Sequence, residues 1–196
     1  MKTTIKVALA ALTIASLAFS GCKKGEGDPF LSLKTRKGRI HGEWKITKGE
    51  GTRSYVFANT TVTETISYDG TTETTTTNPG NSTSTSKWTQ TYEFEKDGAF
   101  TSTYTDNDNN PAVTTTMKGT WNWTGGVGDM KNKSQIVLTV TESTTGSSTS
   151  TYTGSSCPTM VYDVYELKSK EMIFQDKGTQ SSGSENTDKK WTLEKQ

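Results

Sequence analysis

The chain has 196 residues and a formal net charge of +1 at pH 7, so its length predicts one domain and its charge gives no electrostatic reason to bind nucleic acid. Only 29% of the residues are hydrophobic, whereas threonine, which is β-branched and favours strands, makes up about a fifth. The composition therefore predicts an all-β protein in which the five Trp, seven Tyr and six Phe carry much of the core.

The first 21 residues have the three-part pattern of a secretory signal peptide. Lys2 and Lys6 give a positive start, residues 7–19 (VALAALTIASLAF) are uncharged and apolar, and a small Ser-Gly pair precedes Cys22. The apolar run is shorter than the about 20 residues that a membrane-spanning helix needs. The alternatives are an ordinary signal peptide followed by a chance cysteine, and a buried helix.

The Ser-Gly-Cys ending resembles a bacterial lipobox, which implies that the Cys22 thiol is diacylated and that the chain is cut before it. The resemblance divides the chain into a signal peptide (1–21), a lipidated tether (22–28) and a barrel domain (29–196). Acyl chains, at about 0.8 kcal/mol per buried CH₂, then hold the protein on a membrane of the cell envelope. Lys23, where an Asp commonly retains such proteins on the inner membrane, favours the outer membrane and leaves its face open.

Cys157 is the only other cysteine. With Cys22 used as the anchor, it has no partner for an intramolecular disulfide. We expect a half-buried loop thiol in preference to a reactive one.

One short helix and a series of strands follow the tether. In DPFLSLKTRKG, Asp28 is the expected N-cap, Pro29 the first helical residue and Gly38 the stop. After it the sequence predicts strands at 42–48, 60–68, 71–77, 87–95, 99–105, 112–124, 134–142, 160–167, 171–176 and 190–196.

The connections between these strands fall into two groups. Asp-Gly pairs at 69–70 and 97–98 predict tight hairpins, and 125–133 and 168–170 lie at the same end. Long polar segments gather at the opposite end: 49–59, 78–86, 106–111, 143–159 and 177–189. We therefore expect an antiparallel up-and-down meander β-barrel of about eight to ten strands, with a loop-fringed mouth and a closed floor.

The segment HGEW, in which Gly42 and Trp44 open the first strand, resembles the G-x-W signature of lipocalins. EFEKDGAF, KGTWNW and the ending YELKSKEMIF…KKWTLEKQ are similar to lipocalin-like lipoproteins of Gram-negative bacteria. The resemblance covers the chain from about residue 28 and implies a cup for a small hydrophobic ligand. Two features depart from the family: YDVY at 162–165 only faintly matches the second motif, and no Arg stands in the last strand.

In lipocalins that missing Arg covers the Trp of G-x-W. Alternation from Trp191 and Leu193 places Lys195 inward, so we predict that Lys195 lies over the Trp44 ring, its ammonium within about 6 Å of the ring centre. The alternative is a frayed terminus with Lys195 in water.

Alternation also predicts the lining of the cup. Near the floor we expect Phe94, Phe100, Trp121 and Trp44. Near the mouth we expect candidate ligand-binding residues, among them a carboxylate that could orient a polar head: Val62, Glu64, Trp88, Tyr104 and Trp191. Two readings stay open, because these rings could line a pocket or fill the interior as plain core. Glu64 could equally pair with a neighbouring hydroxyl.

Enzyme chemistry finds little support. His41 is the only histidine, with no second base or zinc-type cluster, and we expect it to pack beside Trp44 or face solvent. DNDNN at 106–110 is similar to a Ca²⁺ loop, but Pro111 and Met117 stand where Gly and a bidentate Glu are needed. We expect no catalytic residue, metal or cofactor. A basic run near the anchor is expected to be a solvated face or to contact lipid headgroups: Lys34, Arg36, Lys37 and Arg39.

Two hypotheses of different classes follow. The first is a monomeric, membrane-tethered protein that binds a small hydrophobic ligand in its barrel. The second is an interaction lipoprotein with a filled barrel, whose Thr/Ser-rich loops contact another envelope or surface component.

Overall fold

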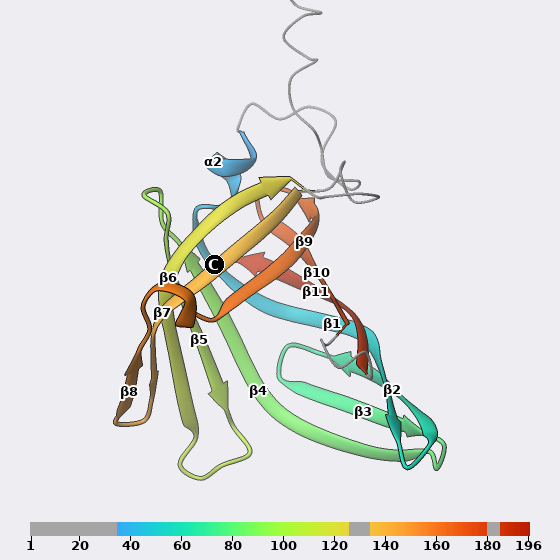
Figure 1. Ribbon diagram of the computed structural model, residues 1–196. Helices are drawn as coiled ribbons and strands as arrows, with labels where there is room; N and C mark the ends of the chain where they lie inside the picture. The colour runs from blue at the N-terminus through green and yellow to red at the C-terminus, as the bar shows by residue number, and fades with distance from the viewer. Residues whose placement is uncertain (1–34, 126–133, 180–184) are drawn as a thin grey trace, which may run out of the picture.

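The computed structural model describes residues 35–125, 134–179 and 185–196 (Figure 1). The predicted signal peptide, Cys22, the tether, Asp28 and Pro29 lie outside the described residues. The elements are α2 (Arg36–Ile40), β1 (Gly42–Phe57), β2 (Thr60–Tyr68), β3 (Thr72–Asn78), β4 (Ser82–Phe94), β5 (Ala99–Asp106), β6 (Val113–Gly125), β7 (Ser134–Thr145), β8 (Ser148–Thr151), the 3-10 turn η2 (Gly154–Ser156), β9 (Thr159–Leu167), β10 (Glu171–Thr179) and β11 (Glu185–Lys195).

The strands form one antiparallel 11-stranded sheet that closes on itself, because β6 pairs with β7. Near α2, β1 also pairs with β4 over Gly42–Lys45, which closes a ring of β1, β4, β5, β6, β7, β9, β10 and β11. Farther along β1, the β2–β3 hairpin lies between β1 and β4 and widens the wall, and β8 adds to β7. The predicted all-β, up-and-down barrel is confirmed.

The short helix α2 lies at the floor end of the barrel (Figure 1). The Thr35 hydroxyl accepts a hydrogen bond from the Gly38 amide at 3.0 Å, so Thr35 is the N-cap. The predicted stop at Gly38 is wrong, since the helix continues to Ile40. Gly38 lies in the first turn, and the helix ends where Ile40 becomes fully buried in the barrel core.

The strands are longer than predicted at the mouth end. Much of the segments expected as loops at 49–59, 78–86, 143–159 and 177–189 is strand, and these loop predictions are wrong. Only two residues, Ala58 and Asn59, join β1 to β2, both with positive φ. Figure 1 shows the resulting hairpins reaching away from α2, β1–β4 to the lower right and β5–β8 to the lower left.

The cause of these errors is the polarity of both strand faces. Thr and Ser alternate there with other polar residues, so no two-residue apolar period marks the segments as strands. Their backbones pair nevertheless, and hydroxyls bond across the strands, as between Ser54 and Thr63 at 3.3 Å and between Thr144 and Thr149 at 3.0 Å. β-branched side chains favour this extended backbone. The tight Asp-Gly turns at the floor end are confirmed, with Gly70 and Gly98 at φ 100° and 99°.

The floor half of the barrel is filled with side chains. The predicted floor residues Trp44, Phe94, Phe100 and Trp121 are each no more than 2% exposed. They pack in one core with aliphatic side chains from four strands: Ile46, Ile136, Leu138, Val140, Val164, Leu167 and Leu193. The aromatic residues at the floor are therefore buried core side chains, and they form the base of the space above them.

Candidate functional site: a cavity above the barrel floor

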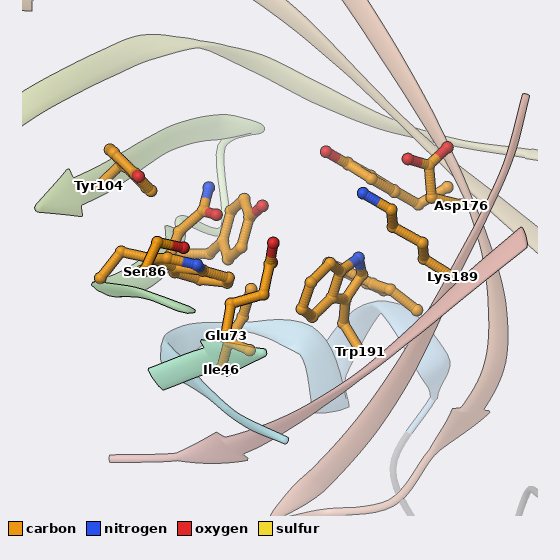
Figure 2. Close-up of a pocket in the computed structure, with 12 residues that line it drawn as sticks. Ile46, Glu73, Ser86, Tyr104, Asp176, Lys189 and Trp191 are labelled. Atoms are coloured by element: carbon orange, nitrogen blue, oxygen red, sulfur yellow. The ribbon is translucent and has the colours of Figure 1, made fainter. Parts of the chain in front are cut away.

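A cavity of about 360 Å³ lies between the filled floor and the mouth. Strands β1, β3, β4, β5, β9, β10 and β11 supply its walls (Figure 2). Besides Ile46, the lining includes six aromatic side chains: Trp88, Tyr92, Tyr104, Tyr162, Phe174 and Trp191. The Trp88 ring centroid is 5.6 Å from that of Trp191 and 5.8 Å from that of Tyr104. A concave site of this size, with aromatic rings and polar groups in its lining, suits a small molecule.

Two contacts set the positions of the tryptophans. Tyr68 of β2 stacks on Trp88 with a centroid distance of 4.0 Å and donates its hydroxyl hydrogen to the Trp88 carbonyl at 2.8 Å. Gly49 of β1 lies directly opposite Trp191, and a Cβ at Gly49 would be 2.3 Å from the indole ring. Glycine at this position therefore makes the space that Trp191 occupies.

A chain of polar groups crosses one wall. Gln90 donates from its amide to the Ser102 hydroxyl at 3.1 Å. Gln90 also forms a hydrogen bond with the Tyr92 side chain, which forms another with Tyr162. Burial, followed by the charge and hydrogen bond of Tyr162, raises the pKa of Tyr92 well above its usual value. Burial likewise raises the pKa of Tyr162. Both phenols stay neutral near pH 7 and can serve a ligand as hydrogen-bond partners.

Three charged side chains line the same cavity: Glu73 of β3, Asp176 of β10 and Lys189 of β11. Figure 2 shows Glu73 and Lys189 pointing into it from different walls. Asp176 and Lys189 are register partners on neighbouring strands. Burial raises the pKa of the Asp176 carboxyl, and the Lys189 charge partly opposes that rise.

The structure brings together three of the five candidate ligand-binding residues. Trp88, Tyr104 and Trp191 line the cavity, whereas Val62 and Glu64 do not. Both lie on the part of β2 that extends past the barrel, opposite Tyr55 and Arg53. Glu64 accepts a hydrogen bond from the Tyr55 hydroxyl at 3.1 Å, as the alternative reading expected, and it also pairs with Arg53 at 3.1 Å.

The sequence analysis missed the polar lining residues: Glu73, Ser86, Gln90, Asp176 and Lys189. Four of them follow from the two-residue period, because Ser86 and Gln90 flank Trp88, Lys189 precedes Trp191 and Asp176 follows Phe174 at that spacing. Glu73 lies in a stretch of threonines that carries no such signal.

Lys195 and Trp44 meet at the floor of the barrel. The Lys195 ammonium lies 5.2 Å from the centroid of the buried Trp44 ring, which confirms the predicted contact. It also donates to the carbonyl oxygens of Arg39, at 3.2 Å, and of His41. Gly42 has φ 111°, and a Cβ there would be 2.9 Å from the Lys195 side chain. The glycine of G-x-W thus allows the lysine to cover the tryptophan.

The remaining sequence candidates have structural roles. His41 packs edge-on against Trp121, with ring centroids 6.1 Å apart, and burial followed by nearby lysines lowers its pKa. The carboxylates of Asp106 and Asp108 bond groups within and beside the β5–β6 loop. Among the described residues, no group of three or more His, Cys, Asp or Glu is placed to hold a metal ion. Cys157 is a half-buried free thiol, as expected.

The expectation of a solvated basic face is wrong for two of its residues. Arg39 is only 6% exposed, and Arg36 lies over the Trp123 ring at 5.5 Å. Arg39 is therefore buried and Arg36 covers an aromatic ring, so neither side chain is a freely solvated surface charge. Lys37 is exposed, and Lys34 lies outside the described residues.

No family model, curated protein or solved structure matches the chain. Within the described ranges, no helix has the length and apolar character to cross a membrane.

Proposed function

We propose that the protein is a lipid-anchored, lipocalin-like protein of the cell envelope that binds a small molecule inside its barrel. The observation that carries the proposal is the cavity at Trp88, Tyr104 and Trp191, with a filled floor beneath it. Its volume of about 360 Å³ is near the lower end of the range of roughly 300–1,000 Å³ for ligand sites. The mixed lining favours a ligand with an apolar body and at least one polar group over a purely hydrophobic one.

Native mass spectrometry of the Cys22→Ser chain, purified without detergent, tests the binding function. We expect one defined molecule to accompany the protein and to be lost when Trp88 and Trp191 are both changed to Leu. The same change at Trp123, which packs under Arg36 at the floor, is the matched control. A ligand-free protein, or one whose bound molecule is indifferent to both tryptophans, would count against the proposal.

A second function has support from the β1–β2 hairpin. Its tip presents Val56 and Phe57 to solvent, 57% and 70% exposed, where an isolated domain gains nothing from exposing them. This favours an interaction lipoprotein whose mouth-end hairpins contact another envelope component. Crosslinking from position 57 in intact cells tests it: a reproducible partner supports this function, and uniform background labelling rejects it.

Substitution of Cys22 tests the proposed attachment to a membrane. We expect Cys22→Ser to abolish membrane attachment, because without the thiol no acyl chains are added. Fractionation of cells, with acyl-chain detection by mass spectrometry, measures this. A Cys22→Ser protein that is cleaved and still firmly bound to membranes would show that the lipobox resemblance is misleading.

A further inference from the structure

The Glu73 carboxylate is the uncompensated charge of the cavity. It lines the space together with the aromatic rings, and it has no ion pair or hydrogen bond within the part of the chain that the structure describes. A half-buried carboxylate loses part of its hydration, so a site that keeps one without a partner is poised to receive a cation.

The rings around Glu73 favour the same kind of ligand. Glu73 is the register partner of Tyr68 on one side and of Ser86 on the other. Burial, followed by the charges of Asp69 and Glu73, raises the pKa of the Tyr68 phenol to about 12. Burial and the charges of Asp106, Glu73 and Asp108 also raise the pKa of Tyr104. Negative potential therefore covers the wall formed by Trp88 and Tyr104, with Tyr68 stacked on Trp88, and aromatic ring faces attract cations.

The one ammonium in the lining does not neutralise this wall. Lys189 projects from β11, beside Asp176 on the neighbouring strand β10, and its charge acts on that carboxyl. The lining holds two carboxylates, Glu73 and Asp176, and one ammonium, Lys189, so its charged side chains together leave a net negative charge.

We propose that the cavity binds small organic amines, with the ammonium group held between the Glu73 carboxylate and the rings of Trp88 and Tyr104. The apolar body of the amine then lies against Phe174 and against Trp191, whose ring packs edge-on against Trp88. This inference rests on the proposed ligand-binding function and names the chemical class of the ligand.

Three probes of similar shape test the proposal: 2-phenylethylamine, 2-phenylethanol and 3-phenylpropanoate. Each is titrated by calorimetry into the full lipid-anchored protein in nanodiscs. We expect the amine to bind at least about ten-fold more tightly than the alcohol, and Glu73→Gln to remove this preference while leaving the alcohol's affinity unchanged. Glu50→Gln, on an exposed β1 carboxylate outside the cavity, is the matched control and should keep the preference.

A second measurement needs no variant. Raising the salt concentration should weaken binding of the amine and leave binding of the alcohol unchanged, because only the amine binds by charge. Equal affinities for amine and alcohol, or a preference that survives in Glu73→Gln, would overturn the amine assignment and leave ligand binding intact. Tightest binding of the carboxylate probe would move recognition to Lys189 and also overturn it. Failure of every probe, with no molecule copurifying, would remove the binding function as well.

Discussion

At the scale of single residues, the floor of the barrel depends on one tryptophan and the lysine above it. Trp44 is fully buried, and its indole nitrogen donates to the Ile40 carbonyl at 2.6 Å, which ties β1 to the end of α2. The Lys195 ammonium lies over the ring and bonds carbonyl oxygens at the end of α2. First strand, last strand and helix therefore meet at this residue.

Trp44→Ala should reduce the free energy of unfolding by about 3–5 kcal/mol, the usual cost of deleting a large core aromatic side chain. Urea denaturation followed by circular dichroism measures the change. A loss below about 1 kcal/mol would mean that the floor repacks without the indole, contrary to its complete burial.

The Trp44–Lys195 contact should appear as a coupling energy. In a double-mutant cycle with Trp44→Leu and Lys195→Met, we expect about 0.5–2 kcal/mol of favourable interaction, because the ammonium is partly desolvated over the ring. Unfolding of the wild type, both single variants and the double variant gives this value. If the effects of the two single variants are additive, the coupling energy is zero and the contact does not contribute to stability.

At the scale of elements, β1 leaves no room for a side chain at two positions that face β11. Opposite Trp191 and Lys189, β1 carries Gly49 and Gly51, where a Cβ would collide with the facing strand. The register between them shifts once, between Ile46 and Lys48. This irregularity and the glycines let the strand turn from the filled floor into the wall of the cavity.

Gly49→Ala tests this close approach. The new methyl group overlaps the Trp191 ring, so we expect a loss of about 1–3 kcal/mol in stability and a displaced indole. Gly178→Ala in β10 is the matched control, because a Cβ there meets nothing within 4 Å. Chemical denaturation and the tryptophan emission spectrum report the two effects. Equal stability of both variants would refute the argument.

At the scale of the whole molecule, the barrel is solid at one end and hollow above it. The eight-stranded ring at the floor encloses a core of large side chains, and insertion of β2 and β3 widens the wall where the cavity lies. Because the cavity keeps ionisable groups partly away from water, the stability of the whole domain depends on their protonation.

The Asp176 carboxyl predicts the sign of one pH effect. Its pKa is raised in the folded state by burial, so the folded protein holds this proton more tightly than the unfolded chain. The contribution is fully present below the ordinary Asp pKa and is lost as pH rises through the folded-state pKa. As the pH rises from about 3 to about 7, the stability of Asp176→Asn should therefore increase relative to that of the wild type. Denaturation at both pH values measures this, and a difference independent of pH would contradict it.

The sequence alone determined the features that depend on local pattern. Large apolar residues two or four positions apart indicated the inward faces of β4 and β11, Asp-Gly pairs located two hairpins, and alternation from Trp191 placed Lys195 over Trp44. These predictions hold because side-chain direction in a strand follows from the residue number.

Only the tertiary structure decided what depends on pairing between distant segments. The threonine-rich hairpins form because their backbones pair with neighbouring strands. No apolar period in the sequence indicates this pairing. Val62 and Glu64 face the predicted side of β2 yet lie past the cavity, because the length of β1 sets how far β2 extends. Glu73 lies beside Trp88 and Tyr104 through the insertion of β3 next to β4. Residues far apart in the sequence form the cavity. The registers of the paired strands, and not the local sequence patterns, therefore determine which side chains line it.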